Sequence, residues 1–178
     1  ICYSDYKDFV PGSCGRAVVN MQVEIDSPDP ENIPGEILAK GMNVMLGYYK
    51  NEEATRQTID ANGWYHTGDL GTKDAHGNIF IKGRSKNMLL GANGQNIYPE
   101  EIEDRLNSMA LVNESVVIQD EDKLVGLVHP DYDEAKSMGL SDKDLETIME
   151  QNRNELNQTQ PAYCKLSAII IHKEEFEK

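Results

Sequence analysis

The order of apolar and polar residues predicts a first half built from strands and turns. Residues 18–25 are mostly apolar with polar interruptions, and residues 35–41 form a short apolar segment between glycines. Both patterns are typical of strands. Residues 78–83 form a further apolar stretch directly after the turn residues 74–77, so the segments on either side of that turn are expected to form a hairpin. A short helix is expected at residues 52–56, capped by Asn51.

In the second half, strands and helices are predicted to alternate. The sequence Pro-Glu-Glu at residues 99–101 favours the start of a helix, because proline suits the first turn and carboxylates suit the positive end of the helix dipole. Ile102, Leu106 and Met109 then recur at helical spacing. Residues 116–118 and 123–128 are expected to pair as strands around the turn 120–122.

The last third of the chain is predicted to contain one long helix and one strand. Ser141 and the three residues after it resemble a capping box at a helix start. Leu145, Ile148, Met149 and Leu156 then fall on one side of that helix. Residues 165–172 are predicted to form the final strand, and the apolar run 168–171 within it is expected to be buried. Together the patterns predict an α+β fold: a β-rich piece up to about residue 84, then a small α+β unit.

Composition indicates a water-soluble globular protein. The chain is 39% hydrophobic and 27% charged, and no apolar run approaches the roughly 18–20 residues that span a membrane. The first residues lack the pattern of a signal peptide, and the missing initiating Met indicates a chain that starts inside a longer protein. Cys2, Cys14 and Cys164 lie far apart without a CxxC pair, which predicts neither disulfides nor a zinc site and favours a cytoplasmic location.

The balance of charge excludes one class of partner. The chain carries 17 Lys and Arg against 31 Asp and Glu, a formal charge of −14, whereas binding of nucleic acid requires a basic face. The charge balance does not exclude binding of a small anionic ligand, because a few local cations suffice to hold it. The four histidines, His66, His76, His129 and His172, are not at metal-ligand spacing, so no protein metal ligand is predicted, and His66 is interpreted as a polar turn residue.

Two charged residues are candidates for ligand binding. Asp69 follows a glycine, where a carboxylate can accept two hydrogen bonds from a ribose diol or can close an Asx turn of a hairpin. Arg84 lies at the end of the next predicted strand. Its guanidinium can bind ribose or phosphate oxygens with fixed geometry, or can pair with one of the many carboxylates.

Several motifs follow one another between residues 34 and 103. They are PGEI at residues 34–37, GMNVMLGYY at 41–49, GWYHTGD at 63–69, GRSKN at 83–87 and GQNIYPEEIE at 94–103. Their order and spacing resemble the signatures of the adenylate-forming superfamily. The chain resembles the C-terminal part of an AMP-forming acyl-CoA synthetase and is most similar to long-chain fatty-acid–CoA ligases.

This resemblance implies a domain organisation and a reaction. Residues 1–84 would be the C-terminal, β-rich part of a large AMP-binding domain, and residues 85–178 a mobile, truncated lid. The parent enzyme would use ATP to convert a fatty acid to acyl-AMP with release of pyrophosphate, and then transfer the acyl group to CoA. Mg²⁺ would be held by residues upstream of the fragment. No transmembrane segment is implied, and peripheral contact with a membrane stays open.

The resemblance also implies roles for individual residues. Asp69 and Arg84 match contacts to the ribose, and Lys86 matches the hinge of the lid, although a solvated lysine fits the same position. Gly94 would line the tunnel for the pantetheine arm of CoA. Asn96 would contact the AMP phosphate, with Gln95 as the second choice. The register of the 89–95 loop is open, because the spacing from Arg84 is one residue longer than in many relatives.

No catalytic residue is assigned within the chain. The phosphate loop and the magnesium glutamate of the family belong upstream of Ile1, and the adenylation lysine is expected after Lys178. Neither Lys173 nor Lys178 has the expected context, so the fragment alone is predicted to be inactive. Three alternatives remain: a peptide-synthetase adenylation domain, an acyl-AMP ligase that delivers to a carrier protein, and a non-catalytic binding module.

Overall fold

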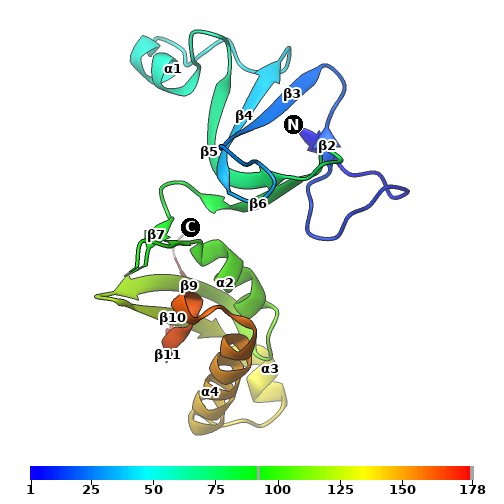
Figure 1. The fold of residues 1–178 in the computed structure, drawn as a ribbon. Helices are drawn as coiled ribbons and strands as arrows, with labels where there is room; N and C mark the ends of the chain where they lie inside the picture. Colours follow the sequence, from blue (N-terminus) through cyan, green and yellow to red (C-terminus); the bar gives the residue numbers. More distant parts are fainter. Residues whose placement is uncertain (92, 177–178) are drawn as a thin grey trace. The chain divides into compact units, whose positions relative to one another are not determined.

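The computed structural model describes residues 1–91 and 93–176. It consists of two compact units, Ile1–Lys86 (unit 1) and Asn87–Lys178 (unit 2), each with its own sheet (Figure 1). The predicted α+β class is confirmed, since both units combine strands with helices. The assignment of residues 1–84 and 85–178 to parts of a larger enzyme stays a prediction.

Unit 1 is built around an antiparallel sheet with strand order β3-β4-β5-β6. The strands are β3 (Met21–Asp26), β4 (Gly35–Gly41), β5 (Tyr65–Lys73) and β6 (Ile79–Arg84), and a separate pair is formed by β1 (Cys2–Tyr3) and β2 (Arg16–Ala17). Val23, Ile25, Ile37 and Ile79 form the buried core of this unit. The alternation of buried and exposed residues in β3 and β4 confirms both predicted strands, although the first begins at Met21 rather than Val18.

Local polar contacts explain the turn and the helix of unit 1. The Asp74 carboxylate accepts hydrogen bonds from the amides of His76 (2.9 Å) and Asn78 (2.8 Å), and the Asn78 side chain bonds to it as well. These bonds, the Asn78 side chain first, lower the pKa of Asp74. Helix α1 (Glu52–Thr58) begins after Asn51, whose Oδ1 accepts from Ala54 N at 3.0 Å. The predicted hairpin and the predicted cap are both confirmed.

Unit 2 is a three-stranded sheet with strand order β11-β10-β9, flanked by helices. Its elements are β7 (Leu89–Leu90), β8 (Asn96–Ile97), α2 (Pro99–Asn107), β9 (Val112–Asp120), β10 (Lys123–Pro130), α3 (Tyr132–Ser137), α4 (Asp142–Thr159), a 3₁₀ turn (Ala162–Cys164) and β11 (Leu166–Ile171). The hairpin β9–β10 is antiparallel as predicted. Strand β11 instead runs parallel to β10, and the connection between them contains α3 and α4.

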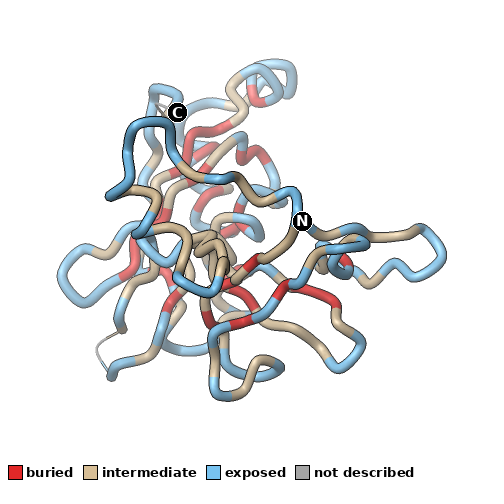
Figure 2. The backbone as a smooth tube through the Cα atoms, turned by 90° about the horizontal axis from the view of Figure 1, so that it is seen from above, coloured by how far each residue is buried: buried red, intermediate tan, exposed pale blue. Residues whose placement is uncertain are grey.

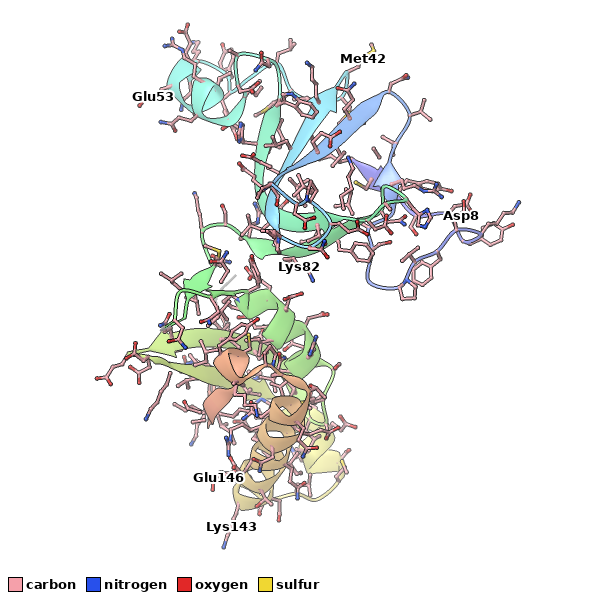
Figure 3. All side chains as sticks on the ribbon, viewed as in Figure 1. Asp8, Met42, Glu53, Lys82, Lys143 and Glu146 are labelled. Atoms are coloured by element: carbon pink, nitrogen blue, oxygen red, sulfur yellow. The ribbon has the colours of Figure 1, made fainter. Side chains whose placement is uncertain are left out.

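The core of unit 2 lies between the sheet and two helices. Helix α2 lies against β9 and α4 against β11. Ile102 and Leu106 of α2 and Leu145, Met149 and Leu156 of α4 are buried, as the helical spacing predicted. Buried and exposed residues are coloured along the backbone in Figure 2. On the outer side of α4, Lys143 and Glu146 point away from the unit (Figure 3). The capping box is confirmed: Ser141 and Asp144 bond each other's backbone amides.

Two expectations about unit 2 are wrong in detail. The 168–171 run forms a strand, but it is not buried: Ile170 is 52% exposed. The reason is that side chains alternate between the two faces of a strand: Ile169 and Ile171 pack against the core on the side of α4, whereas Ile170 points to the opposite face of the sheet. Met109 lies beyond the end of α2 at Asn107, although it packs partly buried against the core. Among the described residues, no helix is both long and apolar enough to cross a bilayer.

Candidate functional site

Strand β5 carries a bulge where the candidate residue Asp69 lies. Glu36 of β4 pairs with Leu70, yet Leu38 pairs with His66. Three residues of β5, 67–69, therefore face the single residue Ile37. A bulge of this kind bends the strand and re-aims its side chains. Gly68 has a φ of +73°, a conformation that glycine adopts at no steric cost.

Strand β4 holds this bulge with two groups. The Thr67 hydroxyl donates to the carbonyl of Ile37 at 2.7 Å and accepts from the amide of Asp69 at 3.0 Å. The Glu36 carboxylate accepts from the amide of Gly68 at 3.0 Å with Oε1, and its Oε2 lies 2.7 Å from His66 Nδ1. The path of residues 66–69 is thus determined by side-chain hydrogen bonds.

Asp69 and Arg84 meet across β5 and β6. Their Cα atoms are in register, and Arg84 Nε lies 3.0 Å from Asp69 Oδ1. Arg84 also donates from a terminal nitrogen to the carbonyl of Thr67 at 3.4 Å. The Asp69 side chain is 33% exposed and that of Arg84 62%, so both remain accessible to a ligand. A carboxylate can accept hydrogen bonds from a diol while a guanidinium beside it donates to the oxygens of the same ligand.

The structure corrects two interpretations of this region. Asp69 lies inside a nine-residue strand and does not close a hairpin through an Asx turn. His66 is not a polar turn residue either, since it is part of β5 and bonds to Glu36. Glu36 was missed as a member of the site. Its presence in the PGEI motif was the one signal that could have pointed to it.

Lys86 lies two residues after the end of β6, in the turn 85–87. It is exposed, and it is the last residue of unit 1. Upstream of it, the amide of Ser85 donates to the carbonyl of Gly68 at 2.9 Å, so the hydrogen-bonded structure of unit 1 extends to within one residue of Lys86. Its position is therefore a boundary between two compact units.

Gly94, Gln95 and Asn96 belong to a small hairpin in unit 2. Gly94 has a φ of +79°, and a Cβ added there would meet nothing within 4 Å. The backbone conformation thus explains this glycine, and no close approach within the unit is needed. Gln95 Oε1 is buried without a hydrogen-bond partner among the described residues, whereas Asn96 is exposed on β8. Ala92, within the loop of open register, lies outside the described residues, as does Lys178.

A cavity of about 450 Å³ opens beside this hairpin. It is lined by Gly91, Asn93 and Gln95 from the loop, by Lys123 of β10, and by Tyr163 and Lys165 near the 3₁₀ turn. The two lysines and the amides supply donors for an anionic ligand, while Asp122 in the same lining contributes one negative charge. Within residues 1–91 and 93–176, no three His, Cys, Asp or Glu side chains form a group that could hold a metal ion. The location of any metal ligand stays a prediction.

Comparisons with known proteins identify the family. No family model matches the chain. It is 41% identical over 128 residues to a 2-succinylbenzoate–CoA ligase of Bacillus cytotoxicus, an alignment that covers 70% of this chain and 26% of that protein. It is 35% identical over 117 residues to the long-chain-fatty-acid–CoA ligase ACSBG2 of Gallus gallus, covering 65% of this chain and 15% of that protein. The chain belongs to the AMP-forming CoA ligases.

A solved structure agrees with this assignment. The anthranilate CoA ligase AuaEII in complex with anthranoyl-AMP is similar with a TM-score of 0.79 and 25% identity, covering 97% of this chain and 32% of that one. The predicted resemblance to the C-terminal part of AMP-forming CoA ligases is thus confirmed, and the α+β fold is that of the C-terminal part of adenylate-forming enzymes. The chain spans about a quarter or less of the length of the two curated relatives described.

Proposed function

We propose that this chain is the C-terminal part of an enzyme that activates a carboxylic acid with ATP and transfers the acyl group to CoA. The first step would form an acyl-adenylate and release pyrophosphate, and the second would form the thioester. The observation that carries the proposal is the Asp69–Arg84 pair on the bulge of β5. In this proposal Asp69 accepts hydrogen bonds from the ribose hydroxyls of ATP and of the adenylate, and Arg84 donates to the same ligand.

The boundary of the two units supports a hinge at Lys86. Residues 1–84 would belong to the large AMP-binding domain and residues 85–178 to a lid that adopts one pose for each half-reaction. Hinge motions are absorbed by a few residues between compact elements. Lys86 is such a residue, since it lies in a turn and ends unit 1. The proposal does not need its side chain, so a solvated lysine is compatible with it.

The cavity of unit 2 supports a role in binding CoA. Its two lysines, Lys123 and Lys165, would face the phosphates of CoA, and the Gly94 hairpin would border the path of the pantetheine arm. Asn96 would contact the phosphate of AMP, with Gln95 as the alternative. Mg²⁺ would be held by residues outside this chain. The enzyme would act in the cytoplasm.

A long-chain fatty acid is the substrate that we propose. The motif at residues 94–103 and the similarity to ACSBG2 support it. The other relatives described act on succinylbenzoate and anthranilate, which are aromatic acids. The identity of the acid that this enzyme activates is therefore tested separately. The full-length enzyme should be assayed for pyrophosphate release with ATP, CoA and a panel of long-chain and aromatic acids. A preference for aromatic acids would contradict this part of the proposal.

The nucleotide site can be tested with two substitutions in the full-length enzyme. Asp69→Ala should cost about 1.5–3 kcal/mol in kcat/KM for ATP, the range for hydrogen bonds that involve a charged group. Arg84→Ala should weaken the same step. Glu24→Ala is a matched control, because Glu24 also pairs with a cation, Lys73 Nζ at 2.7 Å, on the same sheet. Wild-type kcat/KM in both site variants, with normal stability, would contradict the ribose assignment.

Activity of the isolated chain provides a second test. We expect residues 1–178 alone to form no acyl-CoA, because the phosphate loop and the adenylation lysine are not among them. Turnover by this chain would contradict the assignment of those groups to other parts of the protein. A non-catalytic binding module would be indicated if the full-length protein also lacked turnover with every acid of the panel.

A further inference from the structure

Within the described part of the chain, Glu36 is the one side chain that bonds to both neighbours of Thr67, His66 and Gly68. Its Oε1 accepts from the amide of Gly68 at 3.0 Å, and its Oε2 lies 2.7 Å from His66 Nδ1. The partners lie 30 and 32 residues away in sequence. Because the pairing of β4 and β5 shifts between Glu36 and Leu38, the bulged residues lie outside the regular ladder, and the carboxylate serves as their acceptor on β4.

We propose that Glu36 is a positioning residue, which sets the place of the Asp69 carboxylate and thereby the affinity for the nucleotide. This inference rests on the proposed function of Asp69. Glu36 acts through the backbone, because the amide that it binds belongs to Gly68, the residue directly before Asp69. The Asp69 amide is held in turn by Thr67 Oγ1, which is itself anchored to Ile37 next to Glu36. Glu36 and Ile37, two adjacent residues of β4, thus fix the position of the Asp69 backbone.

The chemistry of a carboxylate suits this task. It has two oxygens, and each faces a different donor, so a single side chain fixes two points of β5. The Glu36 side chain is only 27% exposed, and hydrogen bonds in such a partly buried place are less weakened by competing water. Binding groups must be held within a fraction of an ångström of the productive geometry, and Gly68, at a φ of +73°, is a flexible point that needs support.

The inference is tested by a double-mutant cycle in the full-length protein with AMP as the probe. Glu36→Ala, Asp69→Ala and the double variant are compared by calorimetric dissociation constants. Glu36→Ala should weaken AMP binding about tenfold when Asp69 is present and less than about twofold when Asp69 is replaced, because Glu36 acts through Asp69. Equal losses in both backgrounds would show a general structural effect and overturn the inference.

Two further variants separate positioning from folding. Glu36→Gln keeps an oxygen acceptor for the Gly68 amide and should recover most of the affinity lost in Glu36→Ala. Glu24→Ala, which breaks the Glu24–Lys73 pair of the same sheet, should leave AMP binding unchanged. If Glu36→Ala does not fold, Glu36→Asp takes its place in the cycle, since it keeps the charge but is too short to hold the Gly68 amide in the same place. Additive effects of Glu36→Asp and Asp69→Ala would likewise overturn the inference.

The outcomes distinguish this inference from the proposed function. If Asp69→Ala leaves the affinity for AMP unchanged, the ribose assignment itself fails. If Asp69→Ala weakens binding and Glu36→Ala does not, Asp69 binds the nucleotide and Glu36 does not position it. Loss in both single variants, with no further loss in the double variant, supports both.

Discussion

The two units of this chain bury their apolar residues to very different degrees. Unit 2 packs the inner faces of α2 and α4 against one face of its sheet and encloses a continuous core. The core of unit 1 consists of four β-branched residues, while Met42, Leu46 and Tyr49 after β4 are almost fully exposed. Met42 projects from its loop in Figure 3. The candidate ribose-binding residues Asp69 and Arg84 both lie in unit 1, on the sheet with the smaller core.

This contrast shows two ways of holding a functional residue in place. In unit 2, the hairpin with Gly94 precedes a helix whose inner face is fully packed, so packing supports the loop. In unit 1, the strand that carries Asp69 leaves the regular ladder, and the side chains of Glu36 and Thr67 replace the missing backbone partners. Hydrogen bonds are directional and packing is not, which suits a carboxylate that must point at one ligand.

The largest effect on stability is expected from Leu106→Ala in the core of unit 2. Leu106 is 0% exposed, and truncation of a buried leucine costs about 2–5 kcal/mol. Urea unfolding followed by circular dichroism should show the loss, because the long helices α2 and α4 lie in this unit. Trp64, the single tryptophan of the chain, reports on unit 1, and its fluorescence midpoint should not move.

A matched surface variant sharpens this test. Leu90→Ala removes an exposed leucine of the same unit and should change stability by no more than about 0.5 kcal/mol. A shift of the Trp64 transition together with the helical signal in Leu106→Ala would show that the units unfold as one. The difference between the two cores would then not give the two units separate stabilities.

A smaller but more selective effect is expected from Lys86→Pro in the full-length enzyme. Proline fixes φ near −65°, so a hinge at this position would be held in one of its two conformations. One half-reaction should fall about a hundredfold while the other stays nearly intact, since misplaced groups cost rates of this order. Pyrophosphate exchange measures adenylation, and thioester formation from acyl-adenylate and CoA measures transfer.

The control for this variant is Lys86→Ala, which removes the charge and leaves the backbone free. It should be mild in both half-reactions. Equal losses in both half-reactions of Lys86→Pro would indicate misfolding, and no loss in either would place the hinge elsewhere in the chain.

The cap of α4 should contribute about 1 kcal/mol. Ser141→Ala removes the acceptor for the Asp144 amide and should lower the free energy of unfolding by about that amount. Bonds from the Ser141 side chain, followed by its amide, lower the pKa of Asp144. The contribution of this carboxylate is therefore present above its unfolded pKa and is lost as the pH falls through the lowered folded value.

The cap prediction is checked by urea unfolding at neutral and acidic pH. Thr147→Ala serves as a control, since its hydroxyl bonds to the Lys143 carbonyl inside the same helix without capping it. An equal loss in both variants would show that the hydroxyls matter only through general helix propensity.

The smallest effect is expected from Glu103→Gln, and it should depend on pH. Burial raises the pKa of Glu103, while the bond from the Val117 amide (2.7 Å) opposes the shift. The folded state thus holds the proton more tightly than the unfolded state, so stability falls as the pH rises from the unfolded toward the folded pKa. Glutamine keeps the acceptor without the charge.

The Gln variant should therefore gain stability over the wild type between acidic and neutral pH. Unfolding free energies at several pH values test this. A difference that does not change with pH would show that ionisation of Glu103 costs the fold nothing.

The sequence by itself determined the parts of this protein that depend on near neighbours. Asn51 and Ser141 mark helix starts because their side chains cap amides within one turn, and Pro99 marks one because its fixed φ suits the first turn. Asp74 marks a hairpin because its carboxylate binds amides two and four residues on. Helical spacing also identified the buried faces of α2 and α4, since a helix repeats its face every few residues. The ordered motifs identified the family and pointed to Asp69 and Arg84.

Only the tertiary structure decided how strands that are not joined by a hairpin pair, and which of their faces are covered. The exposure of Ile170 follows from the packing of the helices against the other face of β11, where Ile169 and Ile171 lie, and the uniformly apolar sequence of the strand does not encode which face is covered. The bulge at residues 67–69 exists only because β4 and β5 pair out of step, and the contact of Glu36 with His66 spans 30 residues. Strand register is a property of two segments that are distant in sequence, so no pattern within either segment contains it.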